Sequence, residues 1–110
     1  MVKELVENED LEELIERSRT DPILIFKHST QCSISIAAYV EFLKFTQDAS
    51  DVVCGVVLVL ENRRLSNTIA SRFGVRHESP QAIVLRNGRP HWNASHWAIT
   101  IDALSKATKV

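Results

Sequence analysis

The chain has 110 residues, of which 45% are hydrophobic and 25% are charged, a composition typical of a folded globular protein and not of a disordered one. The 13 Lys and Arg nearly balance the 14 Asp and Glu, and the net charge of −1 gives no sign of a general nucleic-acid-binding surface. The presence of only two cysteines excludes a disulfide scaffold and a four-cysteine zinc site built from one chain.

The first half of the chain predicts strands alternating with helices. Val2–Val6 indicates a short edge strand, and Asn8 is expected to cap a helix that ends before Asp21-Pro22. Ile23–Phe26 is an unbroken apolar run, typical of a strand buried on both faces of a parallel sheet. Cys32–Gln47 predicts a helix packed on most sides, because it has two apolar rows. These rows are Ile36, Val40 and Leu43, and Ala38, Phe42 and Phe45.

The second half predicts one more βα pair, a hairpin and a final helix. The expected elements are a strand at Val52–Leu60, a helix from Asn62 to Gly74, hairpin strands at Gln81–Arg86 and Arg89–Asn93 around an Asn87-Gly88 turn, and a helix at Thr100–Thr108. Pro90 cannot donate a ladder hydrogen bond, so its strand is expected at a sheet edge. The order β-α-β-α-β-α-β-β-α predicts an α/β fold with helices on both faces of the sheet.

Residues 1–110 are expected to form a single cytoplasmic domain. Residues 1–10 carry too many charges for a secretory signal, and the longest uncharged apolar run, Val52–Leu60, is far shorter than the ~20 residues of a membrane span. Free thiols stay reduced in the cytoplasm. We expect no nucleic-acid or membrane partner, and a monomer or weak dimer.

Cys32 is the strongest candidate for a reactive group. It follows the first buried strand and lies at a predicted helix start, where free N–H groups and the helix dipole favour a thiolate over a thiol. Lys27 and His28 add positive potential nearby. A partly exposed thiolate is what thiol–disulfide exchange requires. The alternative is a small, inert hydrophobic residue.

Three segments carry a resemblance to one family. Phe26–Ser35, Phe73–Gln81 and Asn93–Trp97, in this order and spacing, resemble the monothiol bacilliredoxin family of bacillithiol-system proteins. Many members have Thr-Cys-Pro-Ile-Ser where this chain has Gln31-Cys32-Ser33-Ile34-Ser35. The resemblance implies a thioredoxin-like domain, with a central mixed β-sheet of four to five strands and helices on both faces. It also implies that Cys32 is the nucleophile and that Pro80 is a cis proline facing it.

Further candidate site residues accompany Cys32 and Pro80. The Ser79 backbone is expected to pair with an extended substrate segment. Ser35 stands where a dithiol enzyme has its second cysteine, and it either donates a hydrogen bond to the Cys32 thiolate or is a plain helix residue. His28 either tunes Cys32 or caps the strand end. The candidate substrate-binding residues are Lys27, His28, Thr30, Gln31, Arg76, Ser79 and Pro80, of which Lys27 and Arg76, with His77, suit carboxylates of a small thiol.

The remaining cysteine and histidines are expected to be structural. Cys54 lies near the start of the second buried strand, at the opposite end of a parallel pair from Cys32, so we predict a core residue and no disulfide between the two. His91 and His96 are five residues apart, but no third ligand is evident, and we predict no metal site.

The leading hypothesis is a monothiol thiol–disulfide oxidoreductase. Cys32 would take a low-molecular-weight thiol, bacillithiol, from thiolated client proteins, with no tightly bound cofactor and bacillithiol as co-substrate. The second hypothesis is an iron–sulfur cluster carrier of the monothiol glutaredoxin type, in which Cys32 is a cluster ligand. Those proteins have Gly after the cysteine, where this chain has Ser33. The third is a non-enzymatic, stress-related thioredoxin-like adaptor.

Overall fold

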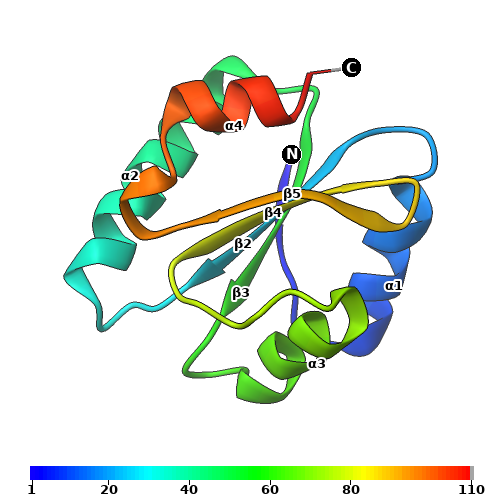
Figure 1. Cartoon of the computed structure of the whole chain (residues 1–110), viewed down its shortest axis with the longest axis horizontal. Helices are drawn as coiled ribbons and strands as arrows, with labels where there is room; N and C mark the ends of the chain where they lie inside the picture. Colours follow the sequence, from blue (N-terminus) through cyan, green and yellow to red (C-terminus); the bar gives the residue numbers. More distant parts are fainter. Residues whose placement is uncertain (110) are drawn as a thin grey trace.

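A five-stranded mixed sheet with helices on both faces forms the protein, as the sequence predicts (Figure 1). The structure is a computed structural model that describes residues 1–109. The strands are β1 (Val2–Glu4), β2 (Ile23–His28), β3 (Val53–Leu58), β4 (Gln81–Arg86) and β5 (Arg89–Ser95). The helices are α1 (Asn8–Arg17), α2 (Ser33–Asp48), α3 (Arg63–Phe73), the short 3-10 helix η1 (His96–Ala98) and α4 (Ile101–Ala107). Among the described residues, no helix is long and apolar enough to cross a membrane.

The sheet order is β1-β3-β2-β4-β5, so the two most apolar strands lie near the centre. β2 pairs in parallel with β3 and antiparallel with β4. β5 is an edge strand, which confirms the position predicted for Pro90. The hairpin turn is also confirmed, because Asn87 and Gly88 have φ values of 54° and 77°, as a two-residue hairpin loop of this kind requires.

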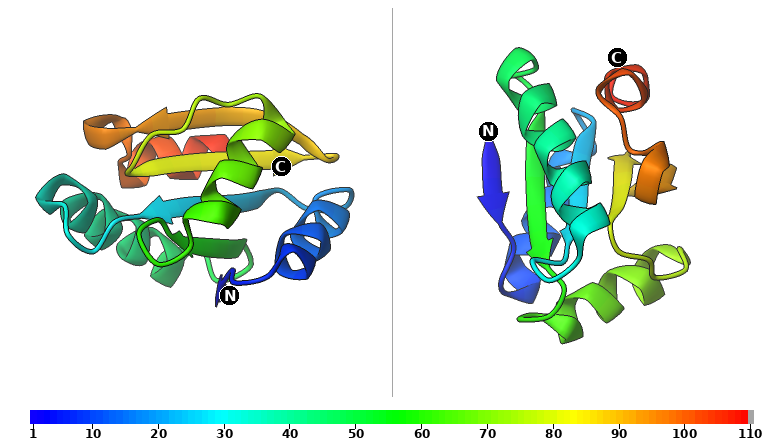
Figure 2. Two further views of the ribbon diagram at one scale, coloured as in Figure 1. Left: turned by 90° about the horizontal axis from the view of Figure 1, so that it is seen from below. Right: turned by 90° about the vertical axis from the view of Figure 1, so that its left-hand side faces the viewer.

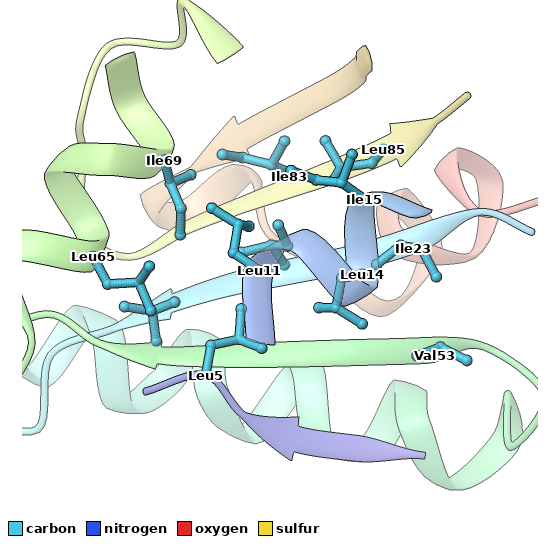
Figure 3. Close-up of a cluster of buried hydrophobic side chains, with 12 residues drawn as sticks. Leu5, Leu11, Leu14, Ile15, Ile23, Val53, Leu65, Ile69, Ile83 and Leu85 are labelled. Carbon is cyan, nitrogen blue, oxygen red and sulfur yellow. The ribbon is translucent and has the colours of Figure 1, made fainter. Parts of the chain in front are cut away.

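Two apolar clusters fill the space on the two faces of the sheet. α1 and α3 cover one face and α2 and α4 cover the other (Figure 2). Figure 3 shows the first cluster, in which Leu11 of α1 and Ile69 of α3 point toward Ile83 of the sheet. Because successive strand residues point to opposite faces, Ile25 and Lys27 of β2 face α3, while Phe26 and His28 face α2.

The start of α1 differs from the prediction, because Asn8 is the first residue of the helix and Glu7 is its N-cap. The Asp10 carboxylate accepts hydrogen bonds from the backbone N–H groups of Val6 and Glu7, each at 2.9 Å. These bonds, aided by Lys3, lower the pKa of Asp10 to about 2. The Asp10 carboxylate thus pairs with the N–H groups that precede the helix. The capping role predicted for Asn8 is filled by Glu7 and Asp10 instead.

The prediction that α2 is packed on most sides is wrong. Ala38, Phe42 and Phe45 are buried, as expected, but Ile36, Val40 and Leu43 are 49%, 46% and 38% exposed. α2 lies on the sheet with α4 and η1 along one flank, and within residues 1–109 no element covers the other flank (Figure 1). Periodicity shows which residues share a row on the helix, but not how many neighbours the helix has.

Candidate functional site

Cys32 is the N-cap residue of α2, the position at which the sequence predicts it. A short loop joins the carboxyl end of β2 to α2 (Figure 1). Cys32 ends this loop and is half-buried. Its own N–H donates to the Ser29 carbonyl at 3.4 Å. The first turn of α2 contains no acidic side chain, and its amide groups lie at the positive end of the helix dipole. Cys32 therefore lies at the end of α2 where backbone N–H groups have no partner within the helix.

Ser35 is buried, and its hydroxyl joins the loop to the strand before it. The Ser29 N–H donates to Ser35 Oγ at 2.8 Å, and His28 Nδ1 lies 2.8 Å from the same oxygen. When Nδ1 carries no proton, Ser35 donates its single hydroxyl proton to His28. That proton is then not directed at the sulfur of Cys32. The structure thus gives Ser35 a positioning role, and the expected hydrogen bond from its hydroxyl to the Cys32 thiolate stays a prediction.

His28 is buried, so it does not offer its ring to a ligand at the surface as expected. Its imidazole stacks on Tyr39 of α2, with ring centroids 4.3 Å apart and an angle of 13° between the planes. Burial lowers the pKa of His28, against the opposing effect of Glu61, and so favours the neutral ring. Tyr39 was missed as part of the site, although its spacing of four residues from Ser35 places both on one face of α2.

Replacing Ser35 with alanine is expected to lower the free energy of unfolding by about 1–3 kcal/mol, because the Ser29 N–H and His28 Nδ1 both lose a buried partner. Urea denaturation at pH 7 measures the change. Ser33→Ala is the matched control, because Ser33 is exposed two residues earlier on the same helix, and its effect should stay within about 0.5 kcal/mol. Equal effects of the two substitutions would contradict the positioning role.

Lys27 lies on the opposite face of β2 and is completely buried. Its Nζ donates to the Ser66 carbonyl at 3.1 Å and lies 3.2 Å from His77 Nδ1, which is also 3.2 Å from Ser66 Oγ. Burial lowers the pKa of Lys27 to about 8. The expected contact between Lys27 and a substrate carboxylate is therefore wrong for this structure, because the ammonium group is enclosed between β2 and α3. No sequence spacing points to Ser66 as its partner.

Residues 74–80 bring the other predicted residues to the carboxyl end of β2. The Ser79–Pro80 bond is cis, which confirms the conformation implied for Pro80. Gln81 Nε2 donates to the Arg76 carbonyl at 3.0 Å, and this bond anchors the loop to β4. The Arg76 side chain is exposed, and Ser79 is half-buried. Thr30 and Gln31, in the loop before Cys32, are also exposed. The side chains of Thr30, Gln31 and Arg76 are therefore available to a ligand, whereas Pro80 is buried.

Cys54 is buried in the second apolar cluster, as predicted. It pairs with Leu24 near the start of β2, whereas Cys32 follows the end of that strand at His28. Four residues of strand span about 13 Å, so the two cysteines lie at opposite ends of the sheet. Both are free thiols. Burial raises the pKa of Cys54 to about 12, so it is protonated and unreactive near neutral pH.

The histidines outside this region do not assemble a cation site. Within residues 1–109, no group of three His, Cys, Asp or Glu side chains is placed to hold a metal ion. His91 projects from edge strand β5, and His96 opens η1. Neither histidine therefore belongs to a group of metal ligands among the described residues.

The chain matches one known family and one solved structure over nearly its whole length. The family described as monothiol bacilliredoxin BrxC matches residues 3–104. A solved structure described as a candidate oxidoreductase with a thioredoxin fold is 34% identical, with a TM-score of 0.89, and the match covers 98% of this chain and 94% of that one. The family match spans both the Cys32 region and the Pro80 loop.

More distant structures share the fold alone. Fasciola hepatica thioredoxin is 17% identical, with a TM-score of 0.75, over 96% of this chain and 95% of that one. Chlamydomonas reinhardtii thioredoxin f2 is also 17% identical, with a TM-score of 0.73, over 96% and 92% of the two chains. The thioredoxin-like fold class inferred from the sequence is thereby confirmed.

Proposed function

The chain belongs to the monothiol bacilliredoxin family, and we propose on that premise that it removes bacillithiol from protein mixed disulfides, with Cys32 as the attacking thiolate. The family and the fold are those of thiol oxidoreductases. The contrast between the two cysteines supports the proposal most directly. Cys32 is half-exposed at a helix N-terminus, whereas Cys54 is buried and its pKa is raised to about 12. Only Cys32 is placed to exchange with a disulfide from solution.

The reaction takes two exchange steps. The Cys32 thiolate attacks the bacillithiol sulfur of a client's mixed disulfide. A bond forms between Cys32 and bacillithiol, the original S–S bond breaks, and the client sulfur leaves as a thiolate that takes a proton from water. A second bacillithiol thiolate then attacks the bacillithiol sulfur held on Cys32. This step releases the Cys32 thiolate and bacillithiol disulfide, so the net reaction consumes one bacillithiol and leaves the client reduced.

The chain contains no thiol that could resolve the intermediate from within. Ser35 occupies the position of a second cysteine but carries no sulfur. Cys54 lies at the other end of the sheet, far beyond the roughly 7 Å between Cα atoms that a disulfide allows. The mixed disulfide on Cys32 therefore persists until an external thiol attacks it.

Incubation with bacillithiol disulfide followed by intact-mass and peptide mass spectrometry tests this proposal. We expect one bacillithiol adduct per chain, on Cys32, and its removal when excess bacillithiol is added. Cys54→Ala should form the same adduct, and Cys32→Ser should form none. An adduct on Cys54 alone, or an unmodified Cys32, would show that the assignment of the nucleophile is wrong.

A further inference from the structure

A groove between α2 and η1 lies beside the site described above. Its volume is about 310 Å³, within the ~300–1,000 Å³ of small-ligand pockets. Ala37 and Ala38 of α2 line it with small side chains, and Trp97 of η1 also lines it. Glu41 and His96 contribute a carboxylate and an imidazole. The groove thus combines an aromatic surface with polar groups, as small-molecule sites do.

Two connections link the groove to the proposed nucleophile. Ser33, Ala37 and Glu41 are four residues apart and form one stripe along α2 that begins directly after Cys32. Five residues of helix advance about 7.5 Å, so Ala37 lies within the reach of a small molecule bonded to Cys32. On the other side, the His96 N–H donates to the Pro80 carbonyl at 3.1 Å. The groove therefore lies close to both Cys32 and the Pro80 loop.

Trp97 is unusually accessible for its type, since 70% of it is exposed. An indole surface attracts C–H-rich rings and cations, and exposed apolar surface of this kind marks binding sites. His96, directly before it, has a φ of 54°, a left-handed conformation that is uncommon for residues other than glycine. Such backbone outliers concentrate at functional sites. Neither the exposure of Trp97 nor the backbone conformation of His96 is explained by packing in the two apolar clusters, which contain neither residue.

Glu41 fixes the polar side of the groove. Its Oε1 accepts the Ile101 N–H at 3.3 Å, which orients the carboxylate beside the start of α4. A carboxylate held in this way accepts hydrogen bonds from ligand hydroxyl groups. The His96 ring offers an N–H donor to an acidic group.

We propose that this groove binds the part of the small thiol that lies beyond its cysteinyl unit, while its sulfur is bonded to Cys32. This inference rests on the proposed function and adds how the protein would recognise bacillithiol over other small thiols. Bacillithiol carries an amino sugar and a dicarboxylic acid on its cysteine. The C–H-rich face of the sugar suits Trp97, its hydroxyl groups suit Glu41, and the acid suits His96.

Kinetics with two mixed disulfides of one reporter peptide test the groove. One peptide carries bacillithiol and the other carries cysteine, which lacks the sugar and the acid. We expect Trp97→Ala to lower kcat/KM for the bacillithiol peptide roughly tenfold, through a higher KM, and to leave kcat/KM for the cysteine peptide unchanged. Trp92→Phe is the control, since Trp92 lies on β5 outside the groove, and it should leave both values unchanged.

Tryptophan fluorescence gives a second readout on the same proteins. Loading Cys32 with bacillithiol should change the emission of the wild type and of Trp92→Phe but not that of Trp97→Phe. Two results would contradict binding in the groove and leave the proposed function standing. One is an adduct on Cys32 with no fluorescence change. The other is an equal loss of kcat/KM for both peptides in Trp97→Ala. The latter result would point to the client peptide as the occupant. A Cys32 that forms no adduct at all would overturn both.

Discussion

Replacing Phe42 with alanine is expected to lower the free energy of unfolding by about 3–5 kcal/mol, a large part of the ~5–15 kcal/mol that holds a typical domain folded. Phe42 is completely buried and stacks on Phe26 of β2, with ring centroids 4.9 Å apart. It also contacts Tyr39, which stacks on His28. A cavity at this position weakens the attachment of α2, the helix that carries Cys32 at its N-terminus.

The matched control for this variant is Val40→Ala, two residues earlier on the same helix. Val40 is 46% exposed, so we expect its replacement to change the free energy of unfolding by no more than about 0.5 kcal/mol. Urea denaturation followed by far-UV circular dichroism measures both variants. Similar losses for Phe42→Ala and Val40→Ala would show that both rows of α2 are packed, contrary to the structure.

The fold was predictable because its central strands and its hairpin turn have strong local signals. Ile23–Phe26 and Val52–Leu60 are too apolar for anything except central strands, and Asn87-Gly88 specifies a tight hairpin turn. The exposed row of α2 was not predictable in the same way. Ile36 and Phe42 are both apolar residues on a helix, and only the positions of α4, η1 and the sheet decide which of them is buried.

The site was predictable in its sulfur and less so in its surroundings. A cysteine that follows a buried strand and precedes a helix can be recognised in the sequence. The structure places Cys32 at the N-cap of α2, as expected. Lys27 and His28 are basic residues near that cysteine and were expected at the surface. Their burial depends on β2 continuing to His28 between two helices, beyond the apolar run that ends at Phe26. The sequence alone does not reveal that a strand extends far enough to bury a charged side chain.

Replacing Lys27 with methionine is expected to raise the free energy of unfolding by about 1–4 kcal/mol at pH 7. The Lys27 ammonium is buried, and no salt bridge within residues 1–109 includes it. Its pKa is lowered to about 8, which means that burial outweighs the two polar contacts to Ser66 and His77. Methionine has a similar length and adapts to irregular space. Ser66 Oγ remains beside His77 Nδ1 in the variant.

The free energy of unfolding depends on pH because the pKa of Lys27 is about 8 in the folded protein and 10.5 in the unfolded chain. Below about pH 8 Lys27 is charged in both the folded and unfolded states, so the full cost of burying the charge is present. Between about 8 and the ordinary value of 10.5, the unfolded state binds more protons than the folded state, and the stability of the wild type rises with pH. The advantage of Lys27→Met should therefore shrink across this window, as urea denaturation at pH 7 and pH 9.5 would measure.

A second measurement separates removal of the buried charge from a general packing effect. Burial is the first cause of the lowered pKa of His77, and the charge of Lys27 is the second. Proton NMR titration should therefore find a higher pKa for His77 in Lys27→Met than in the wild type. Lys44→Met, on the exposed side of α2, should change neither the stability by more than about 0.5 kcal/mol nor the His77 titration. A stability gain that persists undiminished at pH 9.5 would contradict the view that the charge of Lys27, rather than its shape, destabilises the fold.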